Sequence, residues 1–386
     1  MRVLISGGGI AGLTLAYWLQ QYGISATVIE QAECIRQDGY GIDFFGLGYS
    51  VAERMGLIDQ LRSRQIPFDY AAYVNRSGKP VAKLDIALMK KITYGKYMAL
   101  MHWALEEALY EALAGQVEVR FGRSLKSVVS DPDAVSVTFN DGTSESFDIL
   151  IGADGVHSVT RALVFGAEEQ YSHFLGYTIA SYPLPNRYDI GHAWKMYIEP
   201  GRMVGAYASH QESQLFTFYM YQAAERERIP REQRLPHLRQ VFAGMDWITQ
   251  QLLAEAPESE KIFMDTVVQI QMSTWHQGRV ALIGDACGCP TLISGQGASL
   301  AMGGAYVLAR ALHEASNYQE AFRQYEQQMG PHVLEQQKNG RGFAKTFLPG
   351  TPFGLLVQQI MLKTLLRERF IGLLRRQFGT QSASII

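Results

Sequence analysis

The stretch RVALIGDACGCPTLISGQGASLAMGGAYVLARAL, residues 279–312, decides the fold of this chain. Its apolar start, residues 280–283, predicts a buried strand that turns sharply at Gly284-Asp285. Gly295-Gln296-Gly297 then opens a helix of small and apolar residues. A carboxylate at a strand end can accept hydrogen bonds from hydroxyl groups, and a glycine-opened helix N-terminus offers free N–H groups to something anionic and flat. Together these features suggest a flavin, with its ribityl chain on Asp285 and its reduced ring at the helix end.

A second nucleotide-binding pattern opens the chain. Residues 2–6 predict a strand, Gly7-x-Gly9-x-x-Gly12 predicts a tight turn into a helix, and residues 25–30 predict a second strand that ends at Glu30. The glycines permit the turn, the close approach of a pyrophosphate and helix–strand packing, while Glu30 can bond a ribose hydroxyl. The alternative is a glycine-rich structural turn. Because strand, helix, second strand and acid all stand in place, we expect a dinucleotide.

The length, composition and charge of the chain exclude several classes of protein. The 386 residues are enough for two domains, 47% are hydrophobic, and the net charge of −2 gives no reason to expect nucleic acid. Three cysteines are too few for a disulfide framework, and no Cys/His cluster lies near Cys287-Gly288-Cys289, so we expect no metal. The first strand leaves no room for a signal peptide, and no run of about 18 apolar residues could span a membrane. We expect a reduced, cytoplasmic setting.

The pattern of elements predicts an α/β and β-rich fold. We expect a Rossmann-like domain made of residues 1–169 and 276–345, with an inserted mixed-sheet domain over 170–275 where aromatic β-rich segments gather. The apolar stretch 351–378, with interspersed basic residues, predicts a helix. It could lie on a membrane surface or bridge the two domains, and we favour bridging because apolar helix faces are usually core.

A third motif, IGADGVHSVTR over residues 151–161, places Asp154-Gly155 at a strand end and a capping Ser158 after it. Alone it could be a loop leading into a helix. Taken together and in this order, the three motifs resemble those of the class A flavin monooxygenases, the para-hydroxybenzoate hydroxylase-like group, over essentially the whole chain. Within that group, residues 279–309 and the C-terminal helix look most like those of the tetracycline-inactivating monooxygenases.

The resemblance implies FAD as the cofactor. It implies that the first motif and Glu30 hold the ADP half, that Asp154 belongs to a second fingerprint for FAD and nicotinamide, and that Asp285 bonds the ribityl chain. It also places Arg36 near the adenosine or phosphate region, and Pro290 and Gly295 to Ala298 along the isoalloxazine ring. The expected cofactor-binding residues are Gly7, Gly9, Ile10, Ala11, Gly12, Glu30, Arg36, His102, Asp154, Asp285, Pro290, Gly295, Gln296, Gly297 and Ala298.

Two positions depart from the family pattern. The helix beginning near Met101 usually carries an arginine that faces the cofactor, and this chain has His102, whose charge depends on pH. The loop after Asp285 often reads Asp-Ala-Ala-His, whereas here it reads Asp285-Ala286-Cys287-Gly288. A histidine without cofactor contact is the alternative interpretation of His102.

The resemblance also implies a reaction. NAD(P)H reduces FAD, oxygen adds at flavin C4a, and the hydroperoxide hydroxylates a phenolic, enolic or polycyclic small molecule, with aromatic or polyketide-like compounds and tetracycline-like antibiotics as candidates. With one dinucleotide fingerprint, NAD(P)H binds transiently; no side chain is expected to be catalytic, and we expect a monomer. The alternatives are an FAD-dependent dehydrogenase or oxidase without oxygen insertion, and a degenerate relative that only binds a small molecule.

Overall fold

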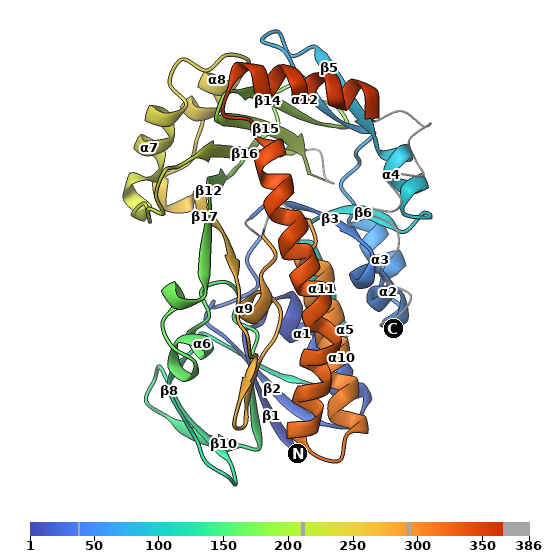
Figure 1. The fold of residues 1–386 in the computed structure, drawn as a ribbon, viewed down its shortest axis with the longest axis vertical. Coiled ribbons are helices and arrows are strands. Elements are labelled where there is room, and N and C mark those ends of the chain that lie inside the picture. The colour runs from blue at the N-terminus through green and yellow to red at the C-terminus, as the bar shows by residue number, and fades with distance from the viewer. Residues whose placement is uncertain (38, 210–212, 292–294, 366–386) are drawn as a thin grey trace.

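The computed structural model describes residues 1–37, 39–209, 213–291 and 295–365 (Figure 1). Its lower layer in Figure 1 is built on a six-stranded sheet in the order β18-β19-β11-β1-β2-β7. All neighbours in this sheet are parallel except the edge strand β18, as expected of a Rossmann-like unit. The strands are β1 (Arg2–Ser6), β2 (Ser25–Glu30), β7 (Glu118–Phe121), β11 (Ile149–Gly152), β18 (His276–Gln277) and β19 (Val280–Leu282).

Different elements cover the two faces of this sheet. Val3 and Ile5 are buried under the helices of one face, and Leu4, between them, is buried against a three-stranded sheet on the other. Successive side chains of a strand point to opposite faces of the sheet. Because both faces of this sheet are covered, its strands are apolar at consecutive positions. The helices are α1 (Ile10–Gln21), α5 (His102–Ala112) and α10 (Gly297–Glu314), and the small sheet contains β8 (Leu125–Ser130), β9 (Val135–Phe139) and β10 (Ser144–Phe147).

The upper layer is an eight-stranded mixed sheet, most of whose strands lie in residues 170–275. It also takes β4 and β5 from the range 1–169, so the layer boundary does not follow the sequence boundary at residue 170. The parallel pair of β14 with β4 joins the two segments. The strands are β4 (Tyr70–Val74), β5 (Pro80–Asp85), β12 (Ser172–Ser181), β13 (Pro183–Pro185), β14 (Ala193–Glu199), β15 (Arg202–Ala208), β16 (Gln214–Gln222) and β17 (Phe263–Ile270).

Shorter elements complete the two layers. Residues 47–63 form two helices separated by Gly56, whose positive φ of 74° ends the first. The remaining elements are β3 (Gly41–Phe45), β6 (Tyr97–Met101), α2 (Leu47–Arg54), α3 (Ile58–Ser63), α4 (Ile86–Ile92), α6 (Val159–Val164), α7 (Arg234–Val241), α8 (Thr249–Ala254) and α9 (Asp285–Gly288), with the 3-10 turns η1 (Glu168–Gln170), η2 (Arg231–Gln233) and η3 (Ser259–Lys261).

The helix α11 (Tyr318–Phe347) bridges the two layers, a position that we expected for residues 351–378. Figure 1 shows α11 running along the long axis of the molecule beside both layers. Gln337 in α11 donates to the carbonyls of Ile270 and Cys289, and Gln269 of β17 donates to the Gln337 carbonyl. These buried amide contacts fix the helix to the junction, which the polar sequence of 318–347 does not reveal.

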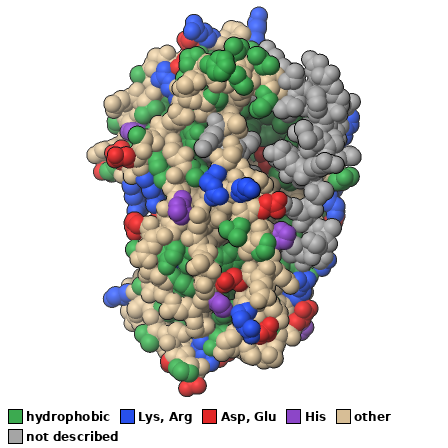
Figure 2. Space-filling model, viewed as in Figure 1, with side chains coloured by type: hydrophobic (Ala, Val, Ile, Leu, Met, Phe, Trp, Pro, Cys, Tyr) green, Lys and Arg blue, Asp and Glu red, His purple; other side chains and the backbone are tan. Residues whose placement is uncertain are grey.

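The helix α12 (Pro352–Leu365) lies across the top of the molecule, and residues 366–378 of the expected helix are outside the described residues. It points a polar residue inward, since buried Gln358 donates to the carbonyls of Thr346 and Phe347. Its apolar residues point outward, and Figure 2 shows hydrophobic side chains gathered there. The exposed ones are Phe353, Leu356, Val357, Ile360 and Met361. Within the described part of the chain, every helix is too short or too polar to cross a membrane.

Candidate functional site

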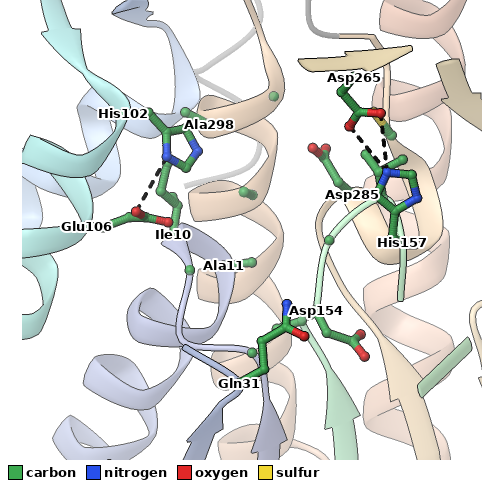
Figure 3. Close-up of a pocket in the computed structure, with 18 of the residues that line it drawn as sticks. Ile10, Ala11, Gln31, His102, Glu106, Asp154, His157, Asp265, Asp285 and Ala298 are labelled. Carbon is green, nitrogen blue, oxygen red and sulfur yellow. Dashed lines mark hydrogen bonds and ion pairs between the residues drawn. The ribbon is translucent and has the colours of Figure 1, made fainter. Parts of the chain in front are cut away.

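A cavity of about 440 Å³ opens at the carboxyl ends of β1, β11 and β19 (Figure 3). The N-termini of α1 and α10 face it from one side, and Phe263 and Val267 of β17 reach it from the upper sheet. The carboxyl edge of a parallel sheet is where such folds bind ligands, because helix N-termini converge there. The cavity therefore lies between the nucleotide-binding layer and the eight-stranded sheet.

The structure brings most of the predicted residues together in this cavity. Three predicted residues do not line it: Gly12, Gln296 and Arg36. Gly12 packs beneath the turn, Gln296 is the N-cap residue of α10, and Arg36 is exposed. The predicted residues that line the cavity are Gly7, Gly9, Ile10, Ala11, Glu30, His102, Asp154, Asp285, Pro290, Gly295, Gly297 and Ala298.

The glycines of the first motif have two different roles. A Cβ on Gly12 would lie 1.9 Å from the Gly7 carbonyl oxygen, so this glycine is required for the turn itself. A Cβ on Gly9 would meet only the Glu106 carboxylate, at 3.3 Å, so the fold does not forbid a side chain there. Gly9 is also the N-cap of α1, which has no side-chain cap, so the first N–H groups of the helix are left for a ligand.

Glu30 lies at the end of β2, as predicted. Its carboxylate accepts hydrogen bonds from the backbone N–H of Gly8 and Ala32, each at 2.8 Å. These bonds tie the second strand to the glycine turn and hold the carboxylate on the cavity wall. A carboxylate can accept about four hydrogen bonds, so Glu30 keeps capacity for a ribose hydroxyl.

Asp285 is a buried carboxylate on the wall of the cavity. Gly284, with a φ of 62°, makes the predicted sharp turn and places Asp285 at the start of α9. Burial raises the pKa of Asp285, and the nearby His102 and the Cys289 thiol oppose that rise. The Tyr40 hydroxyl and the Cys287 thiol also interact with it electrostatically. Among the described residues none of these groups is a backbone donor, so an approaching hydroxyl group finds free acceptor positions. The site therefore fits a polyhydroxyl chain at Asp285.

Asp154, at the end of the neighbouring strand, is bonded within its own turn. Its carboxylate accepts hydrogen bonds from the Ser158 hydroxyl, the Thr160 N–H at 2.8 Å and the Thr160 hydroxyl at 2.9 Å. Ser158 caps α6 by accepting from the Arg161 N–H, as its position in the motif suggests. Asp154 thus shapes the loop that walls the cavity.

His102 begins α5 and faces the cavity from the wall opposite His157 and Asp265 (Figure 3). Its Nδ1 lies 3.5 Å from the Glu106 carboxylate, one helical turn along. Its charge lowers the pKa of Asp285, so it acts on the cavity electrostatically. The histidine is therefore within reach of the region where the family usually places an arginine.

The departure after Asp285 has a packing cause. The expected loop is the short helix α9, and a Cβ on Gly288 would lie 2.7 Å from a methyl group of Val333 in α11. A larger residue there would push the bridging helix away. The thiols of Cys287 and Cys289 are free and buried, and burial raises the pKa of both. In the described part of the chain no three potential metal ligands cluster.

Four residues that line the cavity carried no role in the sequence analysis. Tyr40 packs against His102 and Phe263, with ring centroids 6.0 and 5.7 Å away. His157 and Asp265 pair on the opposite wall. Phe263 and Asp265 alternate along β17, and this period of two was the available signal for a shared face. Nothing in the local sequence says which face meets the cavity.

Comparison with known proteins identifies the family. The family model described as "FAD binding domain" matches residues 1–335. The chain belongs to this family of FAD-binding flavoproteins. A flavin-dependent monooxygenase of Legionella longbeachae serogroup 1 (strain NSW150) is 31% identical over 353 residues, 90% of each chain. Another flavin-dependent monooxygenase, from an unknown prokaryotic organism, is 32% identical over 355 residues, again 90% of each chain.

A solved structure agrees with this assignment. The tetracycline destructase Tet(55) is 26% identical, and the match covers 96% of each chain with a TM-score of 0.82. The expected fold class and the resemblance to class A flavin monooxygenases are confirmed. The protein is an FAD-dependent monooxygenase, and its cavity fits FAD because it offers uncapped helix N-termini and an open carboxylate.

Proposed function

We propose that this monooxygenase hydroxylates a phenolic, enolic or polycyclic small molecule, with NAD(P)H as the electron donor. One observation carries the proposal: a single cavity joins the open carboxylate of Asp285 to an apolar wall from the upper sheet. Ile179, Phe263 and Val267 supply that wall, and Tyr40 lies beside it. An electron-rich ring is the kind of ligand that such an apolar, aromatic wall binds.

In this proposal different groups of the predicted residues bind different parts of FAD. The turn at Gly7 and Gly9 with Glu30 holds the ADP half, and Asp285 accepts hydrogen bonds from the ribityl hydroxyls. Pro290 and residues 295–298, at the start of α10, border the ring. Bound FAD would supply the activation of molecular oxygen with electrons from the nicotinamide.

The protein contributes charge stabilisation and exclusion of water. The N-terminus of α10 has no side-chain cap, so its N–H groups and positive dipole end can stabilise negative charge on a bound ring. The apolar residues of β12 and β17 keep water from the reacting centre, which prevents loss of reducing equivalents. No side chain needs to act as an acid or base for this contribution.

Tetracyclines are the first compounds of this class to test, because the similar Tet(55) is a tetracycline destructase. The experiment measures NADH and NADPH oxidation by FAD-loaded protein with a panel of tetracyclines and phenols, followed by mass spectrometry of products made under ¹⁸O₂. We expect one compound class to stimulate oxidation and to gain one labelled oxygen atom. An oxidised product without label would instead favour a dehydrogenase or oxidase.

A further inference from the structure

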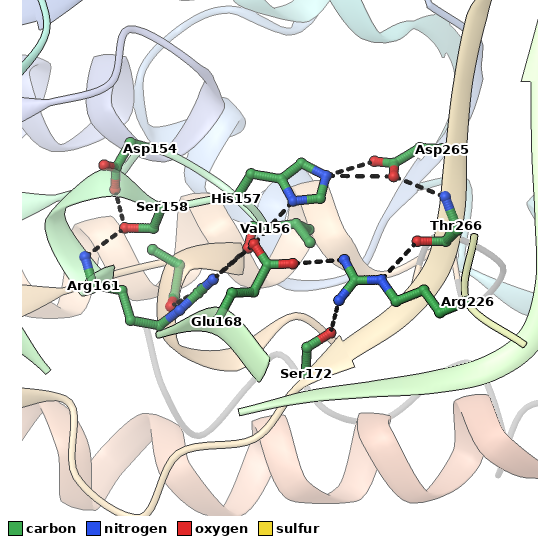
Figure 4. A network of polar contacts seen from close by, with 11 residues as sticks. Asp154, Val156, His157, Ser158, Arg161, Glu168, Ser172, Arg226, Asp265 and Thr266 are labelled. Atoms are coloured by element: carbon green, nitrogen blue, oxygen red, sulfur yellow. Dashed lines mark hydrogen bonds and ion pairs between the residues drawn. The ribbon is translucent and has the colours of Figure 1, made fainter. Parts of the chain in front are cut away.

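A polar network joins the wall of the FAD cavity to the upper sheet (Figure 4). At its centre, His157 of the loop after β11 lies between two carboxylates. Its Nδ1 is 2.9 Å from Glu168 of η1, and its Nε2 is 3.2 Å from Asp265 of β17. The first contact stays next to the nucleotide-binding layer, whereas the second crosses to the eight-stranded sheet.

Two arginines extend the network in both directions from Glu168. Arg226 donates to Glu168 at 2.6 Å, and to the hydroxyls of Ser172 and Thr266 on β12 and β17. Arg161, whose side chain is fully buried, lies 3.3 Å from Glu168 on the other side. It donates to the Val156 carbonyl in the 154–158 loop, which keeps this loop attached to the network.

Arg161 also reaches the turn that carries the FAD-binding carboxylate. Its Nη1 donates to the Ala286 carbonyl at 2.9 Å, one residue after Asp285. A continuous series of contacts therefore runs from the Asp285 turn through Arg161, Glu168 and His157 to Asp265. Because a buried guanidinium is costly to leave unpaired, these loops cannot move independently.

The charges in the network support a protonated His157. The Asp265 and Glu168 hydrogen bonds raise the pKa of His157 to about 9, although burial opposes the rise. Burial would raise the pKa of Glu168, but its bonds to His157 and Arg226 lower it to about 2. The groups that face His157 are thus Glu168 from η1 and Asp265 from β17, with Arg226 and Arg161 behind Glu168. Near neutral pH the pair with Asp265 is an ion pair.

We propose that His157 is a positioning residue that couples FAD binding to the position of β17. It holds Asp265 on one side and, through Glu168 and Arg161, the Asp285 turn on the other. Such coupling is reciprocal. Bound FAD would reduce the mobility of β17, and a β17 fixed in this position would increase the affinity for FAD. The inference goes beyond the proposed reaction and does not depend on the substrate class.

The test measures FAD affinity by flavin fluorescence for wild type, His157→Gln, Asp265→Asn and the double variant. Each single change should weaken FAD about fivefold to tenfold, and the double variant should be no weaker than the singles, because both remove one ion pair. Purely additive effects, or wild-type affinity in both single variants, would overturn the proposal. His276→Gln is the matched control, since His276 of β18 lies beside a carboxylate, Glu326 of α11, and does not line the cavity.

Two further measurements separate coupling from loss of a local contact. Hydrogen exchange with and without FAD should show protection of residues 263–268 in wild type and His276→Gln, and no such protection in His157→Gln. The affinity of the wild type for FAD should fall as the pH rises through about 9, because His157 loses its charge there. His157→Gln should not show this fall. His157→Arg, which is permanently charged, should bind FAD well and show no fall near pH 9. If His157→Gln does not fold, Asp265→Asn and His157→Arg give the same test. A fall that persists in His157→Arg would contradict the proposal.

Discussion

Asp154 and Asp285 follow adjacent parallel strands of one sheet, yet they have different surroundings. Burial raises the pKa of both. Asp154 accepts three hydrogen bonds from Ser158 and Thr160 inside its own turn. Among the described residues, Asp285 interacts with the side chains of His102, Cys289 and Tyr40, which come from other parts of the chain or from beyond its own turn. The comparison teaches that a carboxylate satisfied by its own loop shapes a cavity, whereas one left with free acceptor positions is available to a ligand.

The largest expected effect is on FAD binding in Asp285→Ala. Loss of two hydrogen bonds to a charged acceptor, at about 1.5–3 kcal/mol each, should weaken FAD by about 100-fold or more. The unfolding free energy of the FAD-free protein should stay the same or rise, because a buried carboxylate with few partners is removed. Flavin absorbance per protein after desalting and urea denaturation measure the two quantities. Full flavin content in this variant would remove Asp285 from the site.

Asp154→Ala should show the opposite pattern. It leaves the Ser158 hydroxyl and the Thr160 donors without an acceptor, which should lower the unfolding free energy by about 3 kcal/mol. The loss should be present with and without FAD, as judged by urea denaturation. Ser158→Ala, which removes the cap of α6, is the milder control, with a loss of about 1 kcal/mol. A stable Asp154→Ala protein that loses FAD would show that the two carboxylates have the same role.

The first glycine motif repeats this contrast on a smaller scale. Gly12→Ala should destabilise the protein by about 2 kcal/mol, because its Cβ would overlap the Gly7 carbonyl. Gly9→Ala should leave the unfolding free energy within about 0.5 kcal/mol of wild type, because its Cβ would meet only the end of the flexible Glu106 side chain. It should weaken FAD about tenfold, because the methyl group stands at the uncapped end of α1. Thermal unfolding of the FAD-free proteins and FAD titration measure the two effects. Equal loss of stability in both variants would contradict the separation of roles.

The smallest expected effect is the contribution of His157, which lies in the loop after Asp154, to the pH dependence of the unfolding free energy. The raised pKa of His157 means that its contribution is fully present below about 6.5 and is lost as the pH rises through about 9. Because the side chain is half-exposed, the loss should be under about 1 kcal/mol. Urea denaturation at pH 6 and pH 9.5 should show this difference in wild type and not in His157→Gln. A larger loss in the variant would assign the pH effect to other groups.

The sequence predicted most of the nucleotide-binding frame because local rules govern it. The strand, glycine turn and helix around Gly7 to Gly12, the acid at Glu30 and the turn at Gly284 all lie where their patterns place them. Turn geometry at glycine and the alternation of apolar residues are properties of short segments. The sequence did not show that β4 and β5 join the upper sheet or that α11 runs beside both layers, since both depend on contacts between distant segments.

By itself, then, the sequence determined the dinucleotide-binding turn, the order of the three motifs and the class of flavoprotein they indicate. The tertiary structure decided which of two similar aspartates keeps free acceptor positions and why Gly288 has no room for a side chain. It also decided that His157 meets Asp265, 108 positions away in the chain. The physical reason is range: backbone conformation is set by neighbouring residues, whereas the hydrogen-bond partners of a buried charge come from whatever segments the fold packs around it.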